Sequence, residues 1–141
     1  MKTSVHLIVS LIIAAVLYPF FSWASVFILV GGVLIDIDHY FWYVYKEKKF
    51  GLRECYKYFT SEAEKKQWKY VLGILLVFHT IEFLAFAVIL SFYSKIVFAF
   101  TFGLLSHYIL DALFLLTVSK RVIANHCIIS WMLKKSNNFV I

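Results

Sequence analysis

Four long stretches of the chain are almost entirely apolar, and polar segments of very different length separate them. The stretches cover roughly residues 4–23, 25–45, 70–92 and 95–118, and each approaches the length of about 20 helical residues that a bilayer core requires. The gaps after the first and third stretches are so short that each pair is expected to form an antiparallel helix hairpin. The pattern predicts an all-α fold, an integral membrane four-helix bundle of up-and-down topology that takes up residues 1–141 as a single domain.

Two segments outside these stretches are polar. Residues 46–69 form a long loop, and residues 119–141 form a tail whose apolar middle is too short to span and is expected to lie as an interfacial helix. The composition agrees, because 62% of the residues are hydrophobic, 20% are aromatic and the mean hydropathy is +0.83. A soluble domain of this size does not need so much apolar surface. Gly31, Gly32 and Gly103 are interpreted as positions of close packing between helices.

Basic residues are distributed very unevenly along the chain. Of the fourteen, only Lys95 lies between the third and fourth stretches; Lys2 precedes the first stretch and four follow the last. The remaining eight all lie in the long loop: Lys46, Lys48, Lys49, Arg53, Lys57, Lys65, Lys66 and Lys69. The positive-inside rule therefore places this loop and both termini in the cytoplasm, in an inner membrane. The net charge of +6 is interpreted as a signal for topology and for membrane lipids as partners, and no nucleic acid is expected.

The first apolar stretch also allows another interpretation, a cleavable signal peptide. Lys2 precedes the apolar run, which leads to Ser22-Trp23-Ala24. Bulky aromatic residues are unusual at a cleavage site, and the polar His6 suggests a function for the segment. We therefore expect the segment to be retained.

Acidic residues and histidines lie inside the apolar stretches, and Lys95, at the border of the fourth stretch, is the only Lys or Arg in any of them. The four acidic residues and four histidines are Asp36, Asp38, Glu82, Asp111, His6, His39, His79 and His107. A carboxylate in a bilayer is costly unless a positive charge meets it, so such residues indicate a functional site. With neutral imidazoles the four negative charges would be balanced by two divalent cations.

The spacing of these residues places them in pairs. Asp36 and His39 are three apart, as are His79 and Glu82, and His107 precedes Asp111 by four, so each pair shares one face of an ideal helix. Asp38 points elsewhere on an ideal helix and would turn inward only if the helix loosens there. The pairs and His6 are also expected at similar depth in the cytoplasmic half of the bundle. The sequence therefore predicts that all eight residues converge.

Mixed nitrogen and oxygen ligands suit zinc, our first expectation, or manganese or iron. One or two such ions can activate water and stabilise the leaving oxygen of a phosphoester. All eight residues are candidate ligands, and Glu82 and Asp38 are also the candidate catalytic residues, with Glu82 as general base or acid. The expected activity is a metal-dependent hydrolase, and a lipid or amphiphilic phosphoester is the expected substrate.

The order of these motifs resembles the YdjM-like membrane-bound metal-dependent hydrolases, inner-membrane proteins distantly similar to zinc-dependent phospholipase C. The resemblance rests on an early histidine, Asp-Ile-Asp-His, a central His-Thr and a final His-x-x-x-Asp, and extends from His6 to Leu116. It implies metal binding by the seven residues that match these motifs: His6, Asp36, Asp38, His39, His79, His107 and Asp111. The chain departs from the family at the third motif, where Phe78-His79-Thr80-Ile81-Glu82 has one histidine and no arginine.

Other classes of function stay open at the level of sequence. Histidines on neighbouring helices can ligate haem, and intramembrane carboxylates occur in metal or proton transporters. A metal can also stabilise a helix bundle in a non-catalytic metal-binding site. The substrate, the identity and number of the metals, and assembly into a homo-oligomer are not fixed by the sequence.

Overall fold

A computed structural model describes residues 3–64, 75–114, 116–117 and 127–137 of the chain. Within these ranges the structure is all-helical and contains no strand. The helical elements are α1 (Thr3–Phe21), η1 (Ser22–Ser25), α2 (Val26–Val33), η2 (Leu34–Asp36), α3 (Ile37–Glu47), α4 (Leu52–Glu64), η4 (Val77–His79), α5 (Ile81–Ser91), α6 (Lys95–Phe114) and α7 (Ile128–Asn137). The all-α class predicted from the sequence is therefore confirmed.

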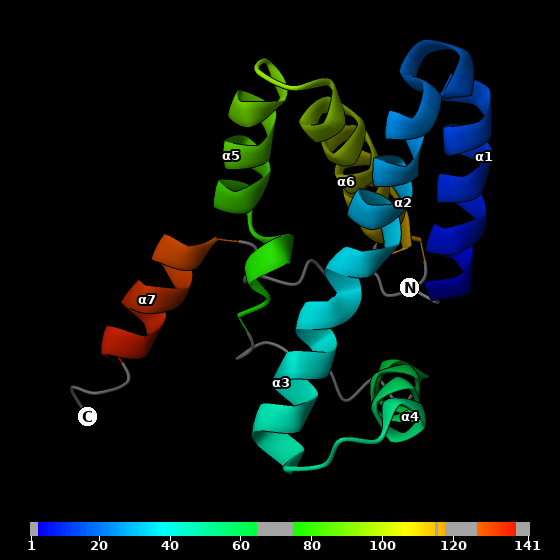
Figure 1. Cartoon of the computed structure of the whole chain (residues 1–141). Coiled ribbons are helices and arrows are strands. Elements are labelled where there is room, and N and C mark those ends of the chain that lie inside the picture. The colour runs from blue at the N-terminus through cyan, green and yellow to red at the C-terminus, as the bar shows by residue number, and fades with distance from the viewer. Residues whose placement is uncertain (1–2, 65–74, 115, 118–126, 138–141) are drawn as a thin grey trace.

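Two helix hairpins organise the described chain (Figure 1). The first joins α1 to α2 through the short 3₁₀ turn η1, where Ser22 adopts a positive φ of 51°. The second joins α5 to α6 through the three residues between Ser91 and Lys95. Helix α6 lies against α1, α2 and α5, so it is the central element of the fold.

Helices α2 and α6 approach each other closely because glycines face the contact. A Cβ atom added at Gly31 would collide with the backbone of Phe100, and one added at Gly103 would collide with the carbonyl of Ile28. A Cβ at Gly32 would meet the hydroxyl of Ser10 on α1. These three glycines are thus the close-packing positions expected from the sequence, and they bring α1, α2 and α6 together.

Two helical stretches have the length and composition needed to cross a membrane. They are Thr3–Glu47 and Lys95–Phe114, and Ile81–Ser91 is apolar but shorter. Signal sequences and the core helices of soluble proteins also pass this test, but a core helix is mostly buried. Here only 17% and 28% of the most apolar windows are buried, and large side chains such as Ile12, Val16 and Phe20 face outward. This exposed apolar surface favours membrane association.

Two of the expected spans are interrupted. The second, expected as one helix over 25–45, changes to a 3₁₀ turn at Leu34–Asp36, after Val33 leaves the helical region with φ −131°. The third was expected over 70–92, but α5 begins only at Ile81, and the extended residues Leu76 and Thr80 flank η4. Residues 65–74 lie outside the described ranges. Both interruptions carry polar residues of the predicted site.

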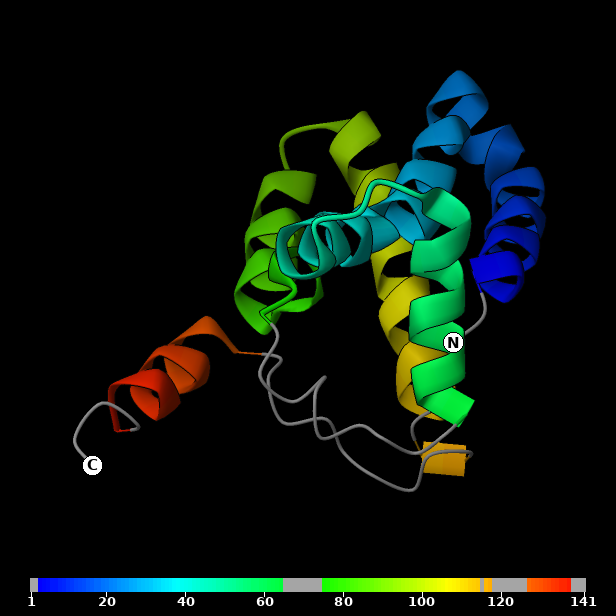
Figure 2. The ribbon, with the colours of Figure 1, turned by 90° about the horizontal axis from the view of Figure 1, so that it is seen from below.

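The loop after α3 contains a helix that packs back on α3. Lys48 ends α3 in the left-handed conformation with φ 56°, and α4 then follows as an amphipathic helix. Cys55 on α4 and Tyr43 on α3 are buried, and the rings of Tyr58 and Phe59 contact Trp42. Burial raises the pKa of the Cys55 thiol above its ordinary value, so this cysteine stays a neutral packing residue. Figure 2 shows α4 from below.

Candidate metal centre

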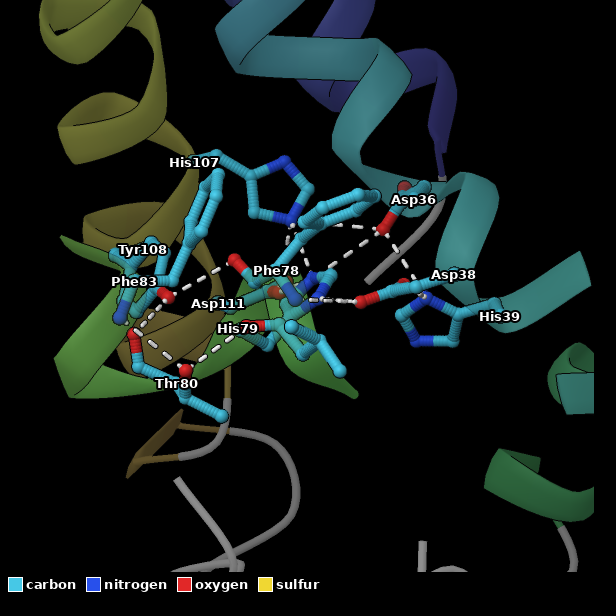
Figure 3. A network of polar contacts seen from close by, with 11 residues as sticks. Asp36, Asp38, His39, Phe78, His79, Thr80, Phe83, His107, Tyr108 and Asp111 are labelled. Carbon is cyan, nitrogen blue, oxygen red and sulfur yellow. Dashed lines mark hydrogen bonds and ion pairs between the residues drawn. The ribbon is translucent and has the colours of Figure 1, made fainter. Parts of the chain in front are cut away.

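Seven of the eight predicted residues meet in one cluster, at the place where the two helix interruptions face α6 (Figure 3). His79 lies in η4, and His107 and Asp111 lie one turn apart on α6. Asp36 ends η2, and α3 then begins. The cluster consists of His6, Asp36, Asp38, His39, His79, His107 and Asp111, linked by contacts of 4.0 Å or less.

His79 and His107 face each other through their Nε2 atoms at 3.2 Å. The Nδ1 atom of His107 lies 2.9 Å from the carbonyl of Gly32, and that of His79 lies 2.9 Å from Asp38 Oδ2. A carbonyl and an ionised carboxylate only accept hydrogen bonds, so both Nδ1 atoms carry the proton. In neutral rings both Nε2 atoms then present lone pairs to each other, and two acceptors do not bond. The pair therefore needs a positive charge, a proton or a metal ion, between the rings.

Asp36 completes a set of three donors around this point. Its Oδ1 lies 3.5 Å from His79 Nε2 and 3.6 Å from His107 Nε2. In a tetrahedral site with bonds of about 2.0–2.1 Å, neighbouring donor atoms lie about 3.4 Å apart. The three separations of 3.2, 3.5 and 3.6 Å thus match one face of a tetrahedron. Asp36, His79 and His107 fit a divalent ion with nitrogen and oxygen ligands.

A second set of donors lies next to the first and includes His6. Asp111 contacts His6 Nε2 through Oδ1 and His107 Nε2 through Oδ2, both at 3.2 Å. The ring of His6 stacks on that of His107 with centroids 3.9 Å apart, and its buried Nδ1 has no hydrogen-bond partner among the residues that the structure describes. His6, His107 and Asp111 are close enough to hold a metal. His107 Nε2 belongs to both sets, so it can serve only one of two ions.

Asp38 lies between two histidines and does not belong to the first donor set, which consists of Asp36, His79 and His107. Its Oδ1 lies 2.9 Å from His39 Nδ1, and its Oδ2 accepts from the backbone N–H of Phe78 in addition to contacting His79 Nδ1. Asp38 is buried, because the 3₁₀ turn before it rotates the start of α3. A carboxylate on the far nitrogen of a ligand histidine fixes its tautomer and orientation. Asp38, His39 and His79 also form a third set within metal-binding distance, which would compete with the first for His79.

Two residues that the sequence analysis missed hold His79 in place. The Tyr108 hydroxyl lies 2.9 Å from the carbonyl of Phe78 and 2.8 Å from that of Thr80, the two neighbours of His79. Thr80 caps α5 by accepting from Phe83 N–H. The only sequence signal for Tyr108 was its position directly after His107. Together Tyr108 and Thr80 fix the irregular backbone that aims His79 at α6.

Glu82 lies in none of the three sets among the described residues. Its Oε1 accepts from Cys127 Sγ at 3.0 Å and from the N–H groups of Ile128 and Ile129 at 2.9 and 3.5 Å. This carboxylate therefore caps the first turn of α7, where it also meets the positive end of the helix dipole. This capping uses Oε1, whereas Oε2 is buried and has no hydrogen-bond partner within the described part of the chain. A role of Glu82 as ligand or general base stays a prediction.

We expect Glu82→Ala to loosen α7 without changing metal content. The substitution leaves the N–H groups of Ile128 and Ile129 without their acceptor, and losing a helix cap costs about 1 kcal/mol. Hydrogen exchange at residues 128–137 should become faster, while residues 95–114 should exchange as in the unchanged protein. Glu82→Gln, which keeps an acceptor oxygen, is the control, and its hydrogen-exchange rates at residues 128–137 should lie between those of the unchanged protein and of Glu82→Ala. Loss of metal from Glu82→Ala would contradict this assignment.

The cluster is partly accessible. The side chains of His39, Asp111 and Asp36 are 28%, 25% and 22% exposed, whereas His6 and His107 are buried at 1% and 0%. Two of the histidines are thus shielded, whereas the three partly exposed residues, which we call the accessible edge, can be reached from outside. Structural metal sites are fully closed, while catalytic sites keep an open position. The accessible edge is the arrangement that a substrate would need.

Comparison with protein-family models found no match, and comparisons with curated proteins and with solved structures found no significant similarity. The chemical assignment of the cluster therefore rests on its own geometry.

Proposed function

We propose that this protein is a membrane-embedded, metal-dependent hydrolase, a phosphoesterase of the kind that the YdjM-like resemblance implies. It crosses an inner membrane four times as an up-and-down bundle, with both termini and the 46–69 loop in the cytoplasm. The exposed apolar surfaces of α1 and α6 and the placement of the basic residues support this topology. The tail that contains α7 lies at the cytoplasmic interface.

One observation carries the proposal: two histidine Nε2 atoms face each other across 3.2 Å, beside a carboxylate, at the edge of an accessible cluster. A proton would also satisfy the two rings and attract Asp36 and Asp111. A divalent ion is favoured because the separations of 3.2, 3.5 and 3.6 Å among Asp36, His79 and His107 match one face of a tetrahedral site. Haem is disfavoured, because a macrocycle does not fit between two rings that approach so closely. Zinc is the first candidate, and manganese or iron suits the same donors.

The residues of the cluster have different roles in such a hydrolase. Asp36, His79 and His107 hold the ion, and Asp111 with His6 offers the second position. Asp38 and the carbonyl of Gly32 keep the two ligand rings in the required tautomer. His39 lies at the accessible edge with its Nδ1 held by Asp38, so its Nε2 is placed to exchange a proton with substrate or solvent. A bound divalent ion supplies Lewis-acid activation of water and of a phosphoester oxygen.

The surroundings of the accessible edge favour an amphiphilic substrate. Leu34 and Ile37, on either side of Asp36 along the chain, are 59% and 46% exposed. A lipid phosphoester can keep its hydrocarbon against such side chains while its phosphate reaches the ions. A fully water-soluble substrate would gain nothing from this apolar rim.

The test is removal and return of the metal in protein purified in detergent. We expect metal analysis to find one or two divalent ions per chain, and chelation to abolish phosphate release from a phospholipid, a polyprenyl phosphate or a generic phosphodiester. Returning zinc or manganese should restore the release, because the donors are already arranged. Stoichiometric metal with no turnover of any of these substrates would reduce the assignment to a structural metal site. If metal analysis finds no divalent ion in the purified protein, the proposal is refuted.

A further inference from the structure

Helix α4 packs on α3 through Cys55, Tyr58 and Phe59. Leu52 and Tyr56, one turn apart on the side that borders this contact, remain 71% and 49% exposed. Arg53 and Lys57 form a parallel basic stripe beside them, also one turn apart and exposed. An aliphatic and aromatic stripe bordered by basic residues is typical of helices that lie in a lipid interface.

Large aromatic side chains are also exposed in the turn before α4 and at the end of α3. Phe50 in the connecting turn is 75% exposed, and Tyr45 on α3 is 76% exposed. The ammonium group of Lys48 lies 4.8 Å from the Tyr45 ring centre, and that of Lys46 lies 4.7 Å from the Trp42 ring centre. Aromatic rings paired with lysines are characteristic of the headgroup region of a bilayer. In water, so many large exposed side chains in and around one short helix would be unfavourable.

We propose that this α3–α4 surface, consisting of Tyr45, Phe50, Leu52, Arg53, Tyr56 and Lys57, docks on the anionic headgroups of the cytoplasmic leaflet. The inference rests on the membrane placement in the proposed function, but not on hydrolysis. Residues 46–59 contain five basic and two acidic residues, a net charge of +3, which complements anionic lipid. Helix α3 follows the apolar α2 after the 3₁₀ turn η2, so this surface begins where the chain leaves the bilayer.

Docking would also position α4 against the metal centre. The edge of Phe59 meets the ring of His39 at a centroid distance of 5.0 Å and an angle of 81°. His39 is the most exposed histidine of the cluster. The lipid-docked α4 therefore holds an aromatic ring at the accessible edge, where an anionic amphiphile from the same leaflet would arrive.

Spin labels on the full-length protein in nanodiscs test the docking. Cysteines are introduced one at a time at Leu52, Tyr56, Glu54 and Ile12, in a background of Cys55→Ala and Cys127→Ala whose helical content is checked by circular dichroism. Power saturation then compares access of oxygen, which is enriched in lipid, with access of a water-soluble nickel chelate. Glu54 is the matched control on α4, because it lies on the opposite side of the helix from Leu52. Ile12 on α1 is the reference for the lipid core.

We expect the oxygen-to-nickel ratio to be several-fold higher at 52 and 56 than at 54, and to rise when phosphatidylglycerol is added to phosphatidylcholine. Arg53→Glu with Lys57→Glu should abolish that rise. A lipid-like reading at 12 with water-like readings at 52 and 56 overturns the docking alone. A water-like reading at 12 overturns the membrane placement and the docking with it. Shielding of 52 and 56 from both reagents would mean that protein covers the surface, and would also overturn the lipid assignment.

Discussion

Replacing His107 by alanine is expected to lower bound metal from stoichiometric to near zero and to abolish hydrolysis. His107 is completely buried, and its Nε2 lies 3.6 Å or less from Asp36, His79 and Asp111. Among the described residues it belongs to both of the first two donor sets, so its removal breaks both; the third set, Asp38, His39 and His79, does not include it, and metal kept by the variant would report binding there. The loss should appear directly in metal analysis of the purified variant, independently of any substrate.

Ser106→Ala is the matched control for this substitution. Ser106 is the neighbour of His107 on α6, but its hydroxyl donates only to the carbonyl of Gly103 within the same helix. Metal content and activity should therefore stay close to those of the unchanged protein. If His107→Ala keeps its metal while its helical content is preserved, the ion is bound elsewhere and the proposed centre is wrong.

Replacing Gly31 by alanine is expected to separate α2 from α6 and to damage the centre from a distance. The added Cβ would collide with the carbonyl of Phe100 and crowd the amide of Leu104, and backbone atoms of a helix cannot move aside as a side chain can. Overpacking of this kind costs about 1–3 kcal/mol. The adjacent Gly32 carbonyl is the acceptor for His107 Nδ1, so we expect a lower melting temperature together with weaker metal binding.

Gly51→Ala gives the comparison for a glycine without this constraint. A Cβ at Gly51 would meet only the carboxylate end of Glu54, a flexible side chain that can rotate away, and its backbone φ is not positive. Thermal stability and metal content should be unchanged. Equal effects of the two substitutions would show that close approach of α2 and α6 is not what positions His107.

The fold class and the meeting of most His and Asp residues of the cluster followed from residue pattern alone. Apolar stretches predicted helices, short gaps predicted the hairpins, and the cost of ionisable groups in apolar segments predicted that they would meet. His107 and Asp111 lie together as their four-residue spacing required, because α6 is a regular helix over that region. These successes share one condition, an uninterrupted helix.

Where the helix is interrupted, spacing rules lose their basis. His79 and Glu82 were assigned to one face, but His79 belongs to η4 and Glu82 to α5, with the extended Thr80 between them. On an ideal helix Asp38 points away from the centre, and the 3₁₀ turn at Leu34–Asp36 is the loosening that its convergence requires. Nothing in the local sequence marks these turns, since they are stabilised by distant partners such as Tyr108. The tautomers of His79 and His107 likewise depend on acceptors that only the folded chain supplies.

The contact between His6 and Asp111 has a consequence for how the protein is made. One partner lies in α1 and the other near the end of α6, and at about 5–20 residues per second several seconds of synthesis separate them. During that time, on the proposed membrane placement, His6 stands in the bilayer without Asp111, and Asp36 without His79 and His107. On the proposed assignment, the ion can be captured only after α6 has been inserted. Supply of metal at that moment would decide whether a newly made chain matures or is left for membrane proteases.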